Sequence, residues 1–166
     1  MPGKVVVVPD ELHIESIARV IEQAIPYDGH HDQVTFNLQD LRFIHPSGIV
    51  VLASLAAWLS QKRECRLEII PPLNGDVQRY LSRMDFYCTL GMDVQEDFRR
   101  YDAAGRFQEM VWLRQERGID EVAAMLVQVI SANICLKKSI KHSLQISIAE
   151  VGSNVFHHGR SPIGGL

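Results

Sequence analysis

The sequence predicts an α/β fold, because strand-like and helix-like segments alternate along its first half. Short runs rich in β-branched residues alternate with segments whose apolar residues recur at three- and four-residue intervals. This alternation is typical of a small domain in which helices pack on a sheet. The character changes after Gly91, where charged residues dominate as far as Gly118 and helical patterns then follow.

Two strand-helix units open the chain. The first strand, 4–8, is a β-branched run that Pro9 ends. The helix predicted for 11–25 carries isoleucine and alanine on one face and must stop before Pro26. A polar, glycine-containing loop then leads into the second strand, 34–38.

The second and third helical signals lie on either side of one more strand. The segment 48–59 is almost wholly apolar and is predicted to be a buried helix. The strand at 65–70 is stopped by two consecutive prolines. The helix at 77–84 follows, with Asn74 or Asp76 as its cap.

The second half has a different organisation. Residues 93–118 form a charge-rich connector, and a strand is expected within it at 107–113. Two helices in series, 121–138 and 139–159, then follow without any further strand signal. We therefore expect an α/β domain over 1–92, followed by the connector and a helical segment over 119–166.

Composition and charge limit the classes of function. The chain has 166 residues, of which 46% are apolar and 22% charged, and its formal net charge is -3. Binding to nucleic-acid phosphates depends on clustered positive charge, so we expect no nucleic-acid partner. The longest apolar run has roughly 12 residues, fewer than the ~20 that a membrane-spanning helix needs. We expect no membrane association and a cytoplasmic location.

The three cysteines, Cys65, Cys88 and Cys135, are widely spaced and form no CxxC pair. Each lies in or beside an apolar stretch. We therefore predict buried free thiols in a reducing compartment.

The turn FIHPSG, residues 43–48, joins a predicted strand to the apolar helix. Pro46 suits the first position of a helix, and it forces His45 out of the helical conformation. Ser47 and Gly48 then lie in the first turn, where unpaired backbone N–H groups favour an anion. The Ser47 hydroxyl has three possible roles: it caps the helix, contacts a bound phosphate or accepts a phosphoryl group.

The order of elements and the string DLRFIHPSGIVVLASLAAWLSQKRECRLEII resemble a STAS domain, the fold of bacterial anti-sigma factor antagonists, over residues 4–92. Members of that family carry Asp-Ser-Ser-Gly in this turn, and a partner kinase phosphorylates the first serine. Here His45 and Pro46 occupy the first two positions, whereas Ser47 and Gly48 match. Because Pro46 has no hydroxyl, the resemblance implies a STAS-like docking or scaffolding module rather than the usual phosphoswitch.

The string ISIAEVGSNVFHHG near the end of the chain places Glu150, Asn154 and His158 at four-residue intervals. On a helix these side chains share one face. An asparagine carbonyl oxygen can bind Mg²⁺, and a glutamate one turn away can accept a proton. The alternative is an ordinary solvated helix face.

The pattern E-x-x-x-N-x-x-x-H-G resembles the N box of histidine-kinase-like ATPases, specifically of anti-sigma serine kinases. The resemblance implies that Asn154 binds Mg²⁺, that Glu150 is the catalytic base, and that His158 and Gly159 lie near the phosphates of ATP. His157 matches no fixed role in that motif.

That family also needs an Asp-x-Gly-x-Gly segment and a glycine-rich lid after the N box, and neither occurs here. We therefore expect residues 119–166 to be an incomplete histidine-kinase-like ATPase segment of a longer protein. By this interpretation the chain itself holds no cofactor and does not hydrolyse ATP. The full-length protein would use ATP and Mg²⁺ as a serine/threonine kinase or an ATPase.

Two functions remain open. The first is a bacterial regulatory protein of the partner-switching type, in which a STAS-like module binds a protein partner and is fused to an ATP-binding module. The second is a non-catalytic interaction module whose C-terminal helices only pack or dimerise. In either case the apolar faces of those helices favour burial in a homodimer.

Overall fold

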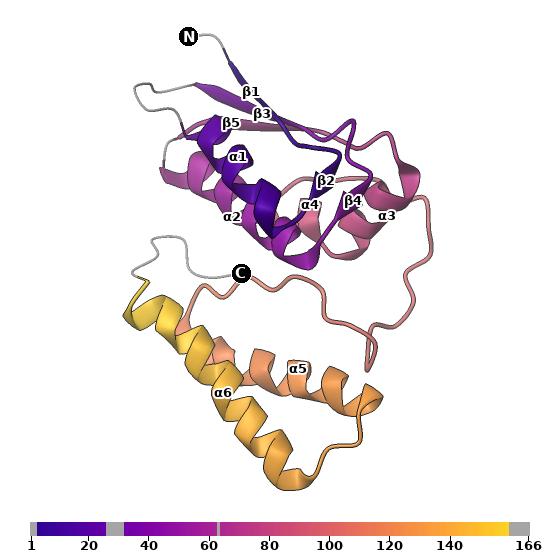
Figure 1. Cartoon of the computed structure of the whole chain (residues 1–166), viewed down its shortest axis with the longest axis vertical. Helices are drawn as coiled ribbons and strands as arrows, with labels where there is room; N and C mark the ends of the chain where they lie inside the picture. The colour runs from indigo at the N-terminus through magenta and orange to yellow at the C-terminus, as the bar shows by residue number, and fades with distance from the viewer. Residues whose placement is uncertain (1–2, 26–31, 63, 160–166) are drawn as a thin grey trace. The chain divides into compact units, whose positions relative to one another are not determined.

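The computed structural model describes residues 3–25, 32–62 and 64–159 (Figure 1). The protein is mixed α/β, as predicted. The chain forms two compact units, Met1–Phe98 and Arg99–Leu166, each described by itself below. The boundary falls within the charge-rich segment 93–118, which therefore contributes residues to both units.

The first unit is built on a parallel sheet in the order β1-β3-β5, formed by Lys4–Val7, Gln33–Asn37 and Arg66–Ile70. The register places Val6 beside Phe36, and Phe36 beside Ile69. Because β3 is central, its apolar residues are buried more completely than those of either edge strand.

The described part of this unit contains four helices: α1 (Ile14–Ala24), α2 (Pro46–Lys62), α3 (Gly75–Arg83) and α4 (Phe86–Thr89). Figure 1 shows α1 and α2 on the same side of the sheet. The core lies between that face and the helices, where apolar burial is the main source of stability. Its largest fully buried side chains include Val6, Val34, Phe36, Leu38, Leu41, Ile49, Leu52, Leu81 and Phe86.

A second, short parallel ladder joins β2 (Glu11–Leu12) to β4 (Phe43–Ile44). It was not predicted, and it corrects the start of the first helix. The helix expected from Glu11 begins instead at Ile14, because Glu11 and Leu12 pair with β4. The backbone N–H of His13 donates to the Ser16 hydroxyl at 3.0 Å and so stabilises the helix start.

The cap of α3 is Asn74, one of the two residues that the sequence indicated. Its side-chain oxygen accepts hydrogen bonds from the backbone N–H groups of Asp76 (3.0 Å) and Val77 (3.3 Å). These bonds satisfy two donors that a helix start otherwise leaves unpaired.

The second unit contains a short 3-10 helix, η1 (Glu116–Gly118), and a helical hairpin of α5 (Ile119–Asn133) and α6 (Lys138–His157). The hairpin is close-packed at Gly152, where an added β-carbon would lie 3.0 Å from Ile119 Cγ2. The strand expected at 107–113 is wrong. These residues form no strand, and among them only Leu113 makes an isolated β-bridge.

The prediction of buried thiols holds for Cys65 only, because Cys88 and Cys135 are exposed. Phe86 and Tyr87 occupy the buried side of α4 and leave Cys88 at the surface. Cys135 lies in the connection between α5 and α6. In the described ranges, no helix has the length and apolar character needed to cross a bilayer.

Tyr87 provides a test of packing in the first unit. Its side chain is 4% exposed, its hydroxyl has no hydrogen-bond partner among the described residues, and burial raises its pKa to about 12. Above pH 10 an unfolded tyrosine ionises while folded Tyr87 stays neutral, so the free energy of unfolding should fall between pH 10 and 12. Tyr87→Phe should raise stability by about 1 kcal/mol at pH 7 and reduce this alkaline loss.

Urea unfolding at pH 7 and pH 11 measures both effects. The matched control is Tyr101→Phe, since Tyr101 is 72% exposed. Some alkaline loss should persist in Tyr87→Phe because burial also raises the pKa of Tyr80. An unchanged alkaline loss in Tyr87→Phe would contradict the assignment.

Candidate functional site

The turn 43–48 lies at the carboxyl end of the parallel sheet. Helices α1, α2 and α3 each begin there, because each follows a strand or strand segment that runs in the same direction. In open α/β sheets, ligands bind outside the carboxyl ends of the strands. The turn 43–48 therefore lies where open α/β folds bind their ligands.

The short ladder between β2 and β4 fixes the position of this turn. The backbone N–H of His45 donates to Leu12 O at 2.9 Å. Gly48 lies directly against the same residue, and an added β-carbon there would lie 2.8 Å from Leu12 O. Glycine is thus required by the close approach of β2 to the first turn of α2.

His45, rather than Ser47, caps α2. The Ser47 backbone N–H donates to His45 Nδ1 at 3.3 Å, and the Ser47 hydroxyl lies 2.8 Å from the same nitrogen. An Nδ1 that accepts from an N–H group carries no proton, so the hydroxyl is the donor in the second contact. The imidazole is exposed and Ser47 is half-buried, so the turn is both ordered and accessible.

Three large apolar side chains are exposed at the same end of the sheet. Ile14 at the start of α1 is 76% exposed, Phe43 in β4 is 52% exposed, and Leu73 after β5 is 78% exposed. Leu73 is held by a backbone hydrogen bond to Gln39 O at 3.1 Å. Exposed apolar residues at one end of a sheet, beside a polar turn, can form an interaction site. We call Ile14, Phe43, His45, Ser47 and Leu73 the carboxyl-end surface.

The second candidate site lies on α6. Glu150 and Asn154 are both exposed on this helix, one turn apart, as predicted. The predicted helix was too long, however, since α6 ends at His157. The backbone N–H groups of His158 and Gly159 both donate to Asn154 O, at 2.9 and 3.0 Å. These two hydrogen bonds to one carbonyl oxygen terminate the helix.

Glu116 forms a network that the sequence did not indicate. Its carboxylate accepts a hydrogen bond from the Ser153 hydroxyl at 2.8 Å, and the same oxygen lies 2.7 Å from His157 Nε2. The Ser153 hydrogen bond, followed by that of His157, holds the pKa of Glu116 below its usual value. The partners are 37 and 41 residues apart, so no local motif reveals them.

A groove of about 580 Å³ runs along α6 beside the start of α5. The lining that the structure describes includes apolar side chains and three carboxylates but neither lysine nor arginine. Such a groove favours a positively charged occupant over a phosphate group. Of the predicted site residues only Glu150 reaches it; the lining is Glu116, Ile119, Asp120, His142, Gln145, Ile146, Ala149, Glu150 and Ser153.

The described residues fit Mg²⁺ only in part. Glu150 and Asn154 offer two oxygen donors on one helix face, and Mg²⁺ is commonly held by one or two carboxylates together with water and substrate phosphates. No group of three or more His, Cys, Asp or Glu side chains in the described ranges is arranged to hold a metal ion. Among the described residues, the groove lining provides no lysine or arginine for a triphosphate.

Comparisons of the chain with protein-family models, with curated proteins and with solved structures found no match. The function is therefore inferred from the geometry of the two sites.

Proposed function

We propose that this chain belongs to a cytoplasmic, bacterial regulatory protein of the partner-switching type, whose first unit is a STAS-like module that docks a protein partner. The observation that carries the proposal is the carboxyl-end surface, where Ile14, Phe43 and Leu73 expose apolar area around an ordered polar turn. A protein partner suits this surface because interfaces combine an apolar centre with a polar rim.

The STAS likeness is supported by the order of elements. Parallel strands β1, β3 and β5 alternate with helices, and the helix that follows β3 begins at Pro46 in the turn. The hydroxyl of Ser47 is bound to His45, and Pro46 offers no phosphoacceptor. The turn is therefore proposed to act as a docking element without phosphorylation. Phosphate found on Ser47 by mass spectrometry, after incubation with a partner kinase, would overturn this part of the proposal.

The second unit is proposed to contribute the N box of an ATP-binding module that is complete only in a longer protein. Glu150 and Asn154 would be its proton acceptor and Mg²⁺ ligand, and their exposure on one face of α6 supports these roles. Bound ATP would supply the phosphoryl group. His158 and Gly159, which follow the helix end, would lie near its phosphates.

The 166-residue chain should show no ATP hydrolysis. The described lining of the groove beside Glu150 is acidic and holds no lysine or arginine, so little in it stabilises a triphosphate. Phosphate release with ATP and Mg²⁺ should equal the buffer rate, and Asn154→Ala should not change it. Mg²⁺-dependent release that Asn154→Ala abolishes would show that the chain is catalytic by itself.

Replacing Phe43 with glutamate should prevent the first unit from binding its protein partner. Phe43 is 52% exposed, so the charge disturbs the docking surface more than the fold. Tagged chains are purified from the cells of origin, and co-purifying proteins are quantified by mass spectrometry. The amount of at least one co-purifying protein should fall about 10-fold or more. The reason is that an interface loses more than about 1.4 kcal/mol of binding free energy when a charge replaces a central aromatic group.

Val5→Glu is the matched control. Val5 is also an exposed apolar residue, at 53%, but it lies on β1 away from the turn. The partner should be retained by this variant. A partner lost equally from both variants, or from neither, would contradict the assignment of the docking surface.

The alternative function is a non-catalytic interaction module, in which α5 and α6 only pack or dimerise. It is favoured by one observation: α6 has no buried residue and so has apolar area available for a partner. A longer form of the protein that binds ATP with Asn154 intact and fails with Asn154→Ala would exclude this alternative.

A further inference from the structure

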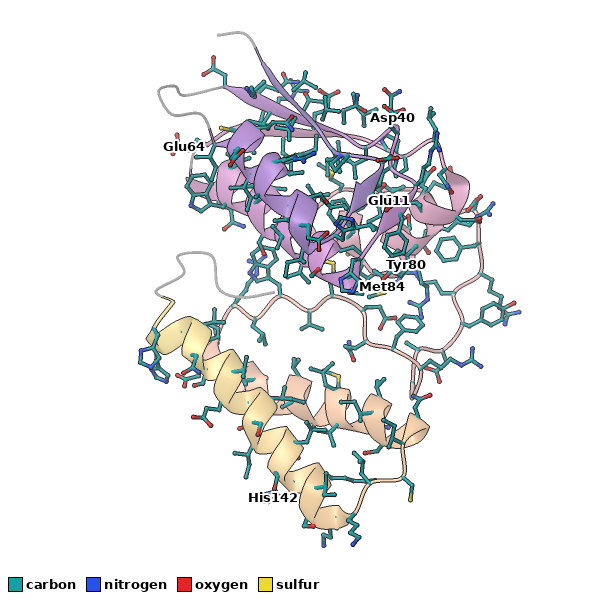
Figure 2. All side chains as sticks on the ribbon, viewed as in Figure 1. Glu11, Asp40, Glu64, Tyr80, Met84 and His142 are labelled. Atoms are coloured by element: carbon teal, nitrogen blue, oxygen red, sulfur yellow. The ribbon has the colours of Figure 1, made fainter. Side chains whose placement is uncertain are left out.

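The groove along α6 is amphipathic, and its most accessible apolar side chain is Ile146. Ile146 is 52% exposed in the middle of the groove lining, with His142 and Glu150 on either side of it along the helix. Figure 2 labels His142 in the first half of α6. An apolar centre between a basic and an acidic group can pair with a second copy of itself.

Charge is distributed asymmetrically along this hairpin. The beginning of α6 is basic, with exposed Lys137, Lys138 and His142 close together. The other end of the groove is acidic, with Glu116, Asp120 and Glu150 in its lining. Two parallel copies would bring like charges together, whereas two antiparallel copies would bring each basic end against an acidic end.

We propose that the chain forms a homodimer in which α6 pairs antiparallel with α6 of a second copy, with Ile146 at the two-fold axis. In this register His142, four residues before Ile146, faces Glu150 of the second copy, four residues after it. The two-fold axis repeats this contact between His142 and Glu150, so that it occurs twice in the dimer. Lys138 lies eight residues before the axis and faces the region of Asn154, next to the Ser153 and Glu116 pair of the second copy.

In this proposal the groove binds a second copy of this chain rather than an unrelated basic peptide. The chain itself carries the complementary basic segment at the matching distance from Ile146, so no additional partner is required. The proposed dimer does not depend on the proposed ATP-binding role. Because both would use Glu150, the dimer is proposed for the protein without nucleotide.

Sedimentation equilibrium across about 1 to 100 µM tests the dimer. Wild-type chains should reach twice the 18.8 kDa mass of the single chain. Ile146→Glu places two carboxylates at the axis and should raise the dissociation constant at least about 100-fold. Val151→Glu is the matched control: Val151 is 69% exposed and lies five residues on, about 140° around the helix, so its dimer should persist.

A charge exchange tests the register independently of Ile146. Glu150→Lys should raise the dissociation constant about 10-fold, and His142→Glu combined with Glu150→Lys should restore it. Residues 142 and 150 are eight positions apart on one helix, beyond the spacing at which helical ion pairs form, so the rescue arises only between copies. Circular dichroism verifies that α6 is retained. A monomeric wild type, equal effects of Ile146→Glu and Val151→Glu, or a failed rescue would each overturn the proposal.

Discussion

Replacing Gly48 with valine is expected to lower the free energy of unfolding of the first unit by about 3 kcal/mol, because the new side chain has no room. An added β-carbon alone would lie 2.8 Å from Leu12 O and 3.1 Å from Leu12 Cγ. The carbonyl cannot move away freely, since it accepts the backbone hydrogen bond of His45. Relief of the clash would separate β2 from the start of α2 and disturb the turn.

Chemical denaturation followed by circular dichroism measures this loss. Gly75→Val is the matched control, because Gly75 also begins a helix but has nothing within 4 Å of the position of an added β-carbon. Its stability should stay within about 1 kcal/mol of wild type. If both variants lost stability equally, the contact with Leu12 would not be the cause.

Phe36→Ala is expected to cost about 3–5 kcal/mol, which is the usual range for removing a buried phenylalanine. Phe36 is fully buried in the central strand and lies between Val6 and Ile69 in the sheet register. Its removal leaves a cavity that strands on both sides keep open. The first unit should then unfold at a much lower urea concentration.

Phe43→Ala is the control for that experiment, because the same side chain is removed from a position that is 52% exposed. Its cost should be below about 1 kcal/mol. Comparable losses from Phe36→Ala and Phe43→Ala would contradict the position of the core.

The sequence predicted the sheet strands and the long helices because each carries its own periodic pattern. It did not predict β2 and β4, which are two residues long and therefore show no period. It wrongly predicted a strand at 107–113, where several apolar residues follow one another but no partner strand exists in the described part of the second unit. Strand formation depends on a partner, and local pattern does not supply one.

The two candidate sites were predictable to different degrees. The turn at 43–48 could be placed between a strand and a helix from sequence, but the need for Gly48 depends on Leu12, a residue distant in the chain. Glu150 and Asn154 share a face because helical spacing dictates it. The contacts of Glu116 with Ser153 and His157 arise from the packing of η1 against α6 and were not predictable from spacing.

Site-specific photo-crosslinking tests the docking surface most directly. Figure 2 labels Asp40 at the carboxyl end of the sheet and Glu64 at the opposite end. A photoreactive phenylalanine analogue replaces Asp40, which is exposed between Gln39 and Phe43, or Gln61, which is exposed near the end of α2. If the partner docks on the carboxyl-end surface, irradiation in the cells of origin should yield a covalent protein adduct from position 40 and none from position 61. Adducts to the same protein from both positions, or an adduct from position 61 alone, would contradict it.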